Sequence, residues 1–169
     1  MAASGSPDPG PAPVHVLESV LQRLLQEEAG LQELVVLALQ EQEALIASDY
    51  AAITRISDMM AETARRVDEL EQERQALLEP LGSAGLHLDE LAPAFDSAGL
   101  PGFASARLRL TARASELREA QERNARLILA AVKLQERWMT MFASLSAPTY
   151  GADGSQDRQA GRGLMSRSA

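Results

Sequence analysis

The sequence predicts an all-α fold, in which a long antiparallel helical hairpin and a third long helix form a coiled-coil-like bundle between disordered termini. Apolar residues make up 46% of the chain and aromatic residues only 4%, so Ala, Leu and other strong helix formers dominate. All eight prolines lie outside 14–79 and 102–147. Because proline breaks helices, these two windows can each be helical.

The first window contains two amphipathic series, which predict helices over about 14–47 and 50–79. Ser48 and Asp49 lie between the series, and both residue types favour the N-cap of a helix. A tight connection favours an antiparallel hairpin, and one continuous helix through 48–49 is the alternative. The apolar positions are Val14, Leu17, Leu21, Leu24, Leu31, Val35, Ala38 and Leu45, then Ile53, Ile56, Met60, Thr63, Val67, Leu70, Leu77 and Leu81.

Residues 80–101 are expected to form a loop that carries the chain back across the hairpin. Within it, LDELAPAF is expected to make a short helical turn, capped by Asp89 or the residue before it. The apolar side chains of the loop should pack on the bundle; they are Leu86, Leu88, Leu91, Phe95 and Leu100.

The third helix, over about 103–146, has the clearest pattern. Apolar residues, with three amide residues among them, recur at steps that alternate between four and three residues, which is the spacing of a heptad seam. The seam is Leu110, Ala114, Leu117, Gln121, Asn124, Ile128, Ala131, Gln135, Trp138, Phe142 and Leu145. A second stripe of Leu127, Leu134 and Met141 lies beside it, so the C-terminal part is apolar over a broad face. Intrinsic helix propensity alone does not stabilise so long a helix, so its apolar stripe must pack against another element.

The domain organisation follows from these windows. Residues 1–13 are rich in Ser, Gly, Pro and Ala and are expected to be a disordered extension, and 148–169 a flexible tail. The helical domain is expected over 14–147. The N-terminus has neither a basic start nor an apolar run, so it does not resemble a secretory signal. No stretch has the length of a membrane span, so stable membrane insertion is not expected.

The charges are distributed unevenly. The net charge is −8, which disfavours binding to nucleic acid or to an anionic membrane surface. Residues 14–79 hold 5 basic and 14 acidic residues, whereas 102–146 hold 8 basic and 4 acidic residues. We expect these oppositely charged elements to pack together, although each surface ion pair contributes at most about 1 kcal/mol. The alternative is that the charges belong to solvated faces.

The residues give no support to enzymatic chemistry, a metal site or a cofactor. The chain has no cysteine. His15 is expected at the start of the first helix and His87 in the loop, and neither belongs to a spaced set of metal ligands. The carboxylates are expected on helix exteriors, and no phosphate-binding or nucleophile motif is present. A small hydrolase or metal enzyme serves only as a contrasting hypothesis, which the absence of a polar pocket would dismiss.

Three features have two interpretations each. Asn124 on the seam is either a buried polar residue that sets the helix register or a hydrogen-bonding site for a partner helix. The apolar cluster around Trp138 either packs in the core or receives another amphipathic helix. Tyr150, in an otherwise polar tail, either folds back on the bundle or acts as a short docking element.

The order of these segments resembles that of FlgN-type flagellar export chaperones. The resemblance covers about 15–154 and rests on QEQEALIASDYAAI at the first turn, ELEQERQALLEPLG, ELREAQERNARLILAAV around Asn124 and the TYGADG tail. Ser48 stands where the family often has Gly, and the Pro-rich extension and the basic tail end have no counterpart.

The resemblance implies a cytoplasmic bacterial chaperone that binds the hook–filament junction proteins before their export. It would hold their amphipathic terminal helices, prevent premature self-association and deliver them to the flagellar export gate. The family's substrate-binding region is the C-terminal part of the third helix, which here corresponds to Leu127, Ile128, Leu134, Trp138, Met141, Phe142 and Leu145. The family's gate-docking tyrosine corresponds to Tyr150. The alternative function is that of a structural coiled-coil protein that homodimerises through its third helix.

Overall fold

A computed structural model of the chain describes residues 14–146, with the backbone alone for Leu145 and Ser146. Its elements are helical throughout: α1 (Val14–Ala47), α2 (Tyr50–Leu78), the 3-10 helix η1 (Glu79–Leu81), α3 (Leu88–Ser97) and α4 (Phe103–Ser146). With no strand in this part of the chain, the all-α fold class is confirmed. The predicted N-terminal extension and C-terminal tail, including Tyr150, lie outside the described residues.

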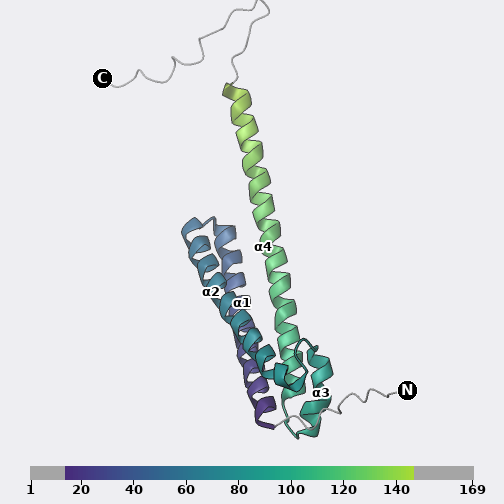
Figure 1. Cartoon of the computed structure of the whole chain (residues 1–169). Coiled ribbons are helices and arrows are strands. Elements are labelled where there is room, and N and C mark those ends of the chain that lie inside the picture. Colours follow the sequence, from purple (N-terminus) through teal and green to yellow (C-terminus); the bar gives the residue numbers. More distant parts are fainter. Residues whose placement is uncertain (1–13, 147–169) are drawn as a thin grey trace, which may run out of the picture. The chain divides into compact units, whose positions relative to one another are not determined.

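α1 and α2 form an antiparallel hairpin and lie side by side (Figure 1). Ser48 has a left-handed φ of 55° and ends α1. Its N–H donates to the carbonyl of Leu45 at 3.2 Å, and the N–H of Asp49 donates to the carbonyl of Ala44 at 3.0 Å. The Asp49 carboxylate then accepts from the N–H of Ala52 at 3.0 Å and caps α2. Two adjacent residues therefore end one helix and begin the next.

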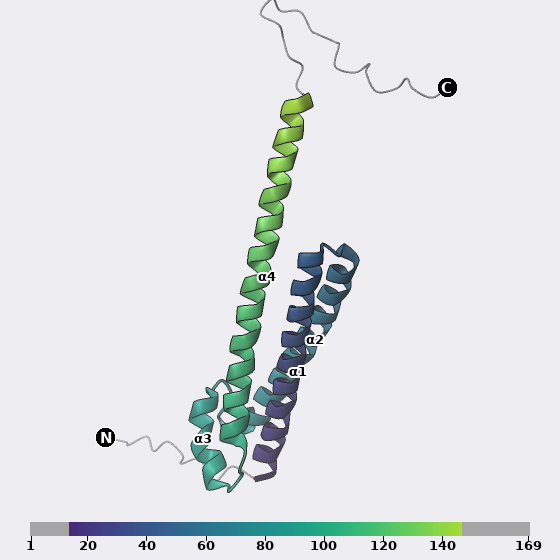
Figure 2. The ribbon, with the colours of Figure 1, turned by 180° about the vertical axis from the view of Figure 1, so that it is seen from behind.

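The main core joins α1, α2, α3 and the beginning of α4. Figure 2 shows α3 beside the start of α4. The rings of Phe95 and Phe103 stack there, with centroids 3.8 Å apart and planes 8° from parallel. This contact holds α3, which lies in the return loop, against the start of α4. The buried members of the core are Leu17, Val20, Leu24, Leu78, Leu91, Phe95, Phe103 and Ala106.

Farther along the hairpin, α1 and α2 pack directly on each other. Leu37, Ala44 and Ile56 form a second buried cluster. Gly30 permits a close approach of the two helices, because a Cβ at that position would lie 2.5 Å from Cγ2 of Val67.

The return loop is more helical than the sequence indicated. α3 has 10 residues, whereas a short turn was expected. It begins after His87, whose N–H donates to the Glu90 carboxylate at 2.7 Å, so the expected cap at Asp89 or Leu88 is wrong. Burial of Leu91 and Phe95 favours the helix, and Pro93 is tolerated on its exposed side. Leu86 is exposed instead of packed.

Candidate functional site

The first half of α4 packs through a single stripe in steps of three and four residues. Its members are buried or half-buried: Phe103, Ala106, Leu110, Arg113, Leu117, Ala120 and Asn124. The predicted seam coincides with this stripe at Leu110, Leu117 and Asn124 but is wrong at Ala114 and Gln121, which are exposed. Ala120, next to Gln121, is buried instead. Two side chains one residue apart lie about 100° apart around a helix, and the smaller apolar one faces the core.

Asn124 is the last buried residue of this stripe, with 3% of its surface exposed. Its Nδ2 donates to the carbonyl of Ala38 at 2.8 Å and to the Glu41 carboxylate at 2.9 Å. An ion pair between Arg109 and Glu28 also joins α4 to α1, whereas Arg107 pairs with Asp89 of α3. Oppositely charged elements therefore pack together, as expected. The geometry supports the interpretation of Asn124 as a buried polar residue that sets register.

The apolar stripe continues beyond Asn124 at the same spacing, but its environment changes. Leu127 is half-buried, and every described side chain from Ile128 to Ser144 is exposed. The same steps of three and four residues lead on through Leu127, Ala131, Leu134, Trp138 and Met141. Large apolar side chains are unusual on a surface when they are contiguous. A sequence pattern typical of a core thus lies at the surface of this part of α4.

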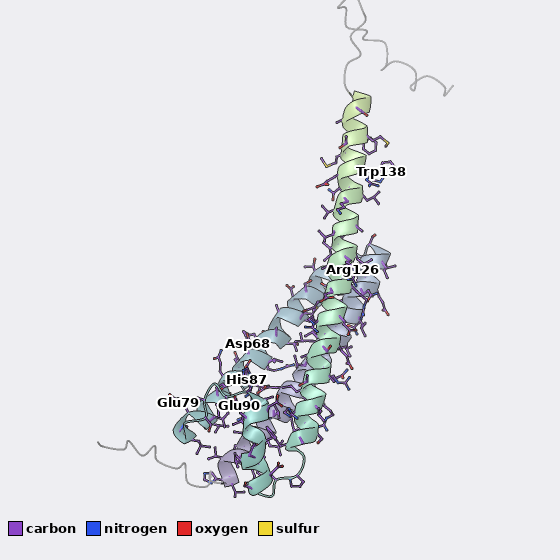
Figure 3. All side chains as sticks on the ribbon, turned by 90° about the vertical axis from the view of Figure 1, so that its right-hand side faces the viewer. Asp68, Glu79, His87, Glu90, Arg126 and Trp138 are labelled. Carbon is purple, nitrogen blue, oxygen red and sulfur yellow. The ribbon has the colours of Figure 1, made fainter. Side chains whose placement is uncertain are left out.

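The exposed face is wider than one stripe. Trp138 is 49% exposed and Phe142 58%, and their rings stack with centroids 6.1 Å apart. Figure 3 labels Trp138 on α4, past Arg126 along the helix. Lys133, Arg137 and Thr140 lie on the opposite, polar side. The helix is therefore amphipathic where its apolar side is exposed.

Six predicted partner-binding residues lie on this face: Leu127, Ile128, Leu134, Trp138, Met141 and Phe142. Leu145 belongs to α4, although its side chain is not described, and Tyr150 is outside the described residues. The residue set missed three large exposed side chains, Leu129, Val132 and Met139. The four-residue spacing of Val132 from Ile128 and of Met139 from Gln135 was the signal that could have identified two of them, whereas Leu129 lies opposite Trp138 on the helix.

A cleft lined by both charged and apolar side chains also lies between α1, α2, the loop before α3 and the first half of α4. Its volume is about 580 Å³, and its lining includes Glu27, Asp68, Arg74 and His87; Figure 3 labels Asp68 and His87. Nε of Arg74 donates to the buried Glu27 carboxylate at 2.7 Å. Burial raises the pKa of Glu27, and the hydrogen bond and charge of Arg74 oppose this shift. Because the carboxylate is engaged by Arg74, we interpret this pair as a link between α1 and α2.

Within residues 14–146, no cluster of three or more His, Asp and Glu side chains is placed to hold a metal ion. No helix in this range is both long enough and apolar enough to cross a bilayer.

The fold and the exposed face define an all-α protein whose last helix carries an amphipathic surface beyond its buried part. A comparison with family models agrees with the resemblance noted in the sequence: the model described as FlgN protein matches residues 16–158. The chain belongs to the FlgN family of flagellar export chaperones. No curated protein and no solved structure matches it.

Proposed function

We propose that the chain binds the amphipathic terminal helices of hook–filament junction proteins on the apolar face of α4, in the cytoplasm, before their export. The continuation of the core stripe into exposed residues supports this most strongly. Leu127, Leu134 and Met141 are spaced to accept the apolar side of another helix. Met and aromatic side chains adapt to partners of different shape.

This arrangement also explains how binding protects the client. A terminal helix that self-associates does so through its apolar side, and the α4 face covers that side. A client that becomes helical only on binding loses conformational entropy, which lowers its net affinity. Moderate affinity suits a chaperone that must release its client. Delivery to the export gate, with Tyr150 as the docking residue, is the second part of the proposal.

Calorimetric titration with a synthetic terminal helix of a junction protein tests the first part. Trp138→Ala and Phe142→Ala should each weaken binding at least tenfold, because aromatic anchors dominate such interfaces. Both side chains are exposed, so circular dichroism should show unchanged helicity. Thr140→Ala, on the polar side of α4, is the matched control and should bind within twofold of wild type.

A parallel loss of helicity and binding would contradict a dedicated binding face. Tyr150→Ala separates the two parts of the proposal: it should bind the helix normally and reduce secretion of the junction protein. Normal secretion by this variant would remove Tyr150 from the delivery step.

A further inference from the structure

The exposed part of α4 carries two rows of residues, and in each row the steps alternate between four and three residues. Row A is Leu127, Ala131, Leu134, Trp138 and Met141. Row B is Ile128, Val132, Gln135, Met139 and Phe142. Each member of row B directly follows a member of row A in the sequence. Because successive residues of an α-helix are about 100° apart around its axis, the two rows are also about 100° apart.

Row B is as apolar and as exposed as row A. Val132 is 45% exposed and Met139 65%, compared with 55% for Leu134 in row A. Gln135 is the one polar member of the two rows. The remaining side of this part of α4 is mainly polar, with Lys133, Glu136, Arg137, Thr140 and Ser144 beside Leu129. The two rows therefore form one broad apolar surface with polar residues at its edges.

The first half of α4, which packs on the bundle through one stripe, has no second row. From Leu110 to Asn124, the residues that directly follow the members of the buried stripe are all exposed, and none is a large apolar residue. They are Thr111, Ala114, Arg118, Gln121 and Ala125. A helix that packs through one stripe thus keeps the adjacent positions polar or small. The second apolar row begins only at Ile128.

Two rows are more than a single neighbouring helix covers. A coiled-coil seam uses two of every seven positions, and a helix facing a bundle core uses about three. Rows A and B together use four, as in Ala131, Val132, Leu134 and Gln135. A corner helix of a four-helix bundle contacts its two neighbours in directions at roughly right angles, which is close to the angle between the rows. The surface of α4 therefore suits two neighbouring helices, one on each row.

The helices that cover the rows have to come from outside this part of the chain. From Ile128 onward, α4 is the one element among the described residues. Two copies of α4 that paired through one row each would leave the other row of both copies exposed. Two helices of one client molecule can cover both rows, because binding of the first helix holds the second at a high effective concentration.

We propose that α4 binds two amphipathic helices of the same client molecule at once, one on row A and one on row B. This inference rests on the proposed function, which assigns the client to this face of α4, and extends it from one bound helix to two. The single-helix peptide of the titration above occupies row A, which contains Leu134 and Trp138. Row B takes the second helix of the intact client.

Substitutions that affect one row at a time test this with a purified junction protein. Leu134→Gln changes row A on the side away from row B, and Met139→Gln changes row B on the side away from row A. Each should weaken binding of the junction protein at least tenfold, and the double variant at least a hundredfold. For the single-helix peptide, Leu134→Gln should weaken binding at least tenfold and Met139→Gln should remain within twofold of wild type.

Thr140→Gln is the matched control, because it introduces the same residue on the polar side of α4. It should bind the junction protein and the peptide within twofold of wild type. All three substituted side chains are exposed, so circular dichroism should show unchanged helicity. Junction-protein binding that is unaffected by Met139→Gln but weakened by Leu134→Gln would refute this inference alone. If neither variant weakened binding, the proposed function would fail as well.

Photo-cross-linking identifies what covers each row. The chain has no native cysteine, so Leu134→Cys and Met139→Cys can each be labelled with benzophenone maleimide. In the complex with the junction protein, the two labels should cross-link to two different helices of the client, which peptide mass spectrometry distinguishes. Capture of the same client helix from both positions would overturn the inference. So would capture of a second copy, or of α1 or α2 of the same chain, from position 139, because row B would then be covered by the protein itself.

Discussion

The side-chain amide of Asn124 in α4 donates to the backbone carbonyl of Ala38 in α1 at 2.8 Å. This bond and the one to Glu41 occur at the last buried position of the α4 stripe. A helix carbonyl retains acceptor capacity beside its own intrahelical bond, so a buried amide donor can be satisfied there. The contact favours one register of α4 against α1, because a shift of α4 along α1 would leave the buried Asn124 amide unpaired.

Asn124→Asp should destabilise the fold by more than about 3 kcal/mol at neutral pH, because it removes both donors and places a carboxylate beside Glu41. Below the raised pKa of the new carboxyl, protonation restores a donor, so the loss should shrink near pH 4.5. Urea unfolding followed by circular dichroism at both pH values measures this. Gln121→Glu adds the same charge at an exposed position of α4 and should change stability by less than about 0.5 kcal/mol. Equal losses at the two pH values would contradict the role given to the donor.

The buried Glu27 carboxyl group predicts a dependence of the folding stability on pH. Its folded-state pKa is raised above 4.5, mainly by burial. Between the unfolded and folded pKa values the native state binds more protons than the unfolded state, so the contribution of Glu27 to stability falls as pH rises through that window. The stability advantage of wild type over Glu27→Gln should therefore decrease from pH 4.5 towards neutrality. Denaturant titrations of both proteins across this range measure the difference, and an advantage that grows with pH would reverse the assigned sign.

Gly30→Ala should destabilise the hairpin by about 1–3 kcal/mol, although alanine is the better helix former. The added methyl would lie 2.5 Å from Val67 Cγ2, so one helix must shift. Val67→Ala removes that methyl from α2. In the Val67→Ala background, Gly30→Ala should become stabilising by up to about 1 kcal/mol. Thermal unfolding of the four proteins in this cycle tests the change of sign; additive effects would show that the two residues do not interfere.

The sequence predicted those elements for which local signals agree with packing. The hairpin was predictable because Ser48 and Asp49 interrupt two regular apolar series, and the long third helix because 103–146 contains no proline. The cap of α3 was missed because the Glu90 carboxylate accepts from the backbone of His87, an arrangement that does not require an Asn, Asp, Ser or Thr cap.

For the candidate site, residue type and spacing identified the apolar face but not its exposure. Ala120 and Trp138 both fit a core stripe, yet Ala120 is buried and Trp138 is not. Periodicity shows which side of a helix is apolar. Which part of that side is buried depends on the other elements that pack against it. For the same reason the exposed apolar residues of α1 could not be distinguished from its core positions: Leu34 and Leu39 are chemically alike, and only Leu34 is buried.

The turn between α1 and α2 yields the last prediction. Ser48 has a left-handed φ of 55°, which a residue with a Cβ adopts at a cost of about 1–2 kcal/mol. Ser48→Gly removes this strain but increases the entropy of the unfolded chain, so a net gain of about 0.5–1 kcal/mol is expected. Asp49→Ala should have the opposite effect, a loss of about 0.5–2 kcal/mol, because the N–H of Ala52 loses its side-chain acceptor. Urea unfolding of the two variants, with Ser57→Gly as a mid-helix control that should lose about 0.5–1 kcal/mol, measures both effects. If Ser48→Gly were as destabilising as Ser57→Gly, the left-handed conformation assigned to Ser48 would be wrong. A single continuous helix through 48–49 would then again have to be considered.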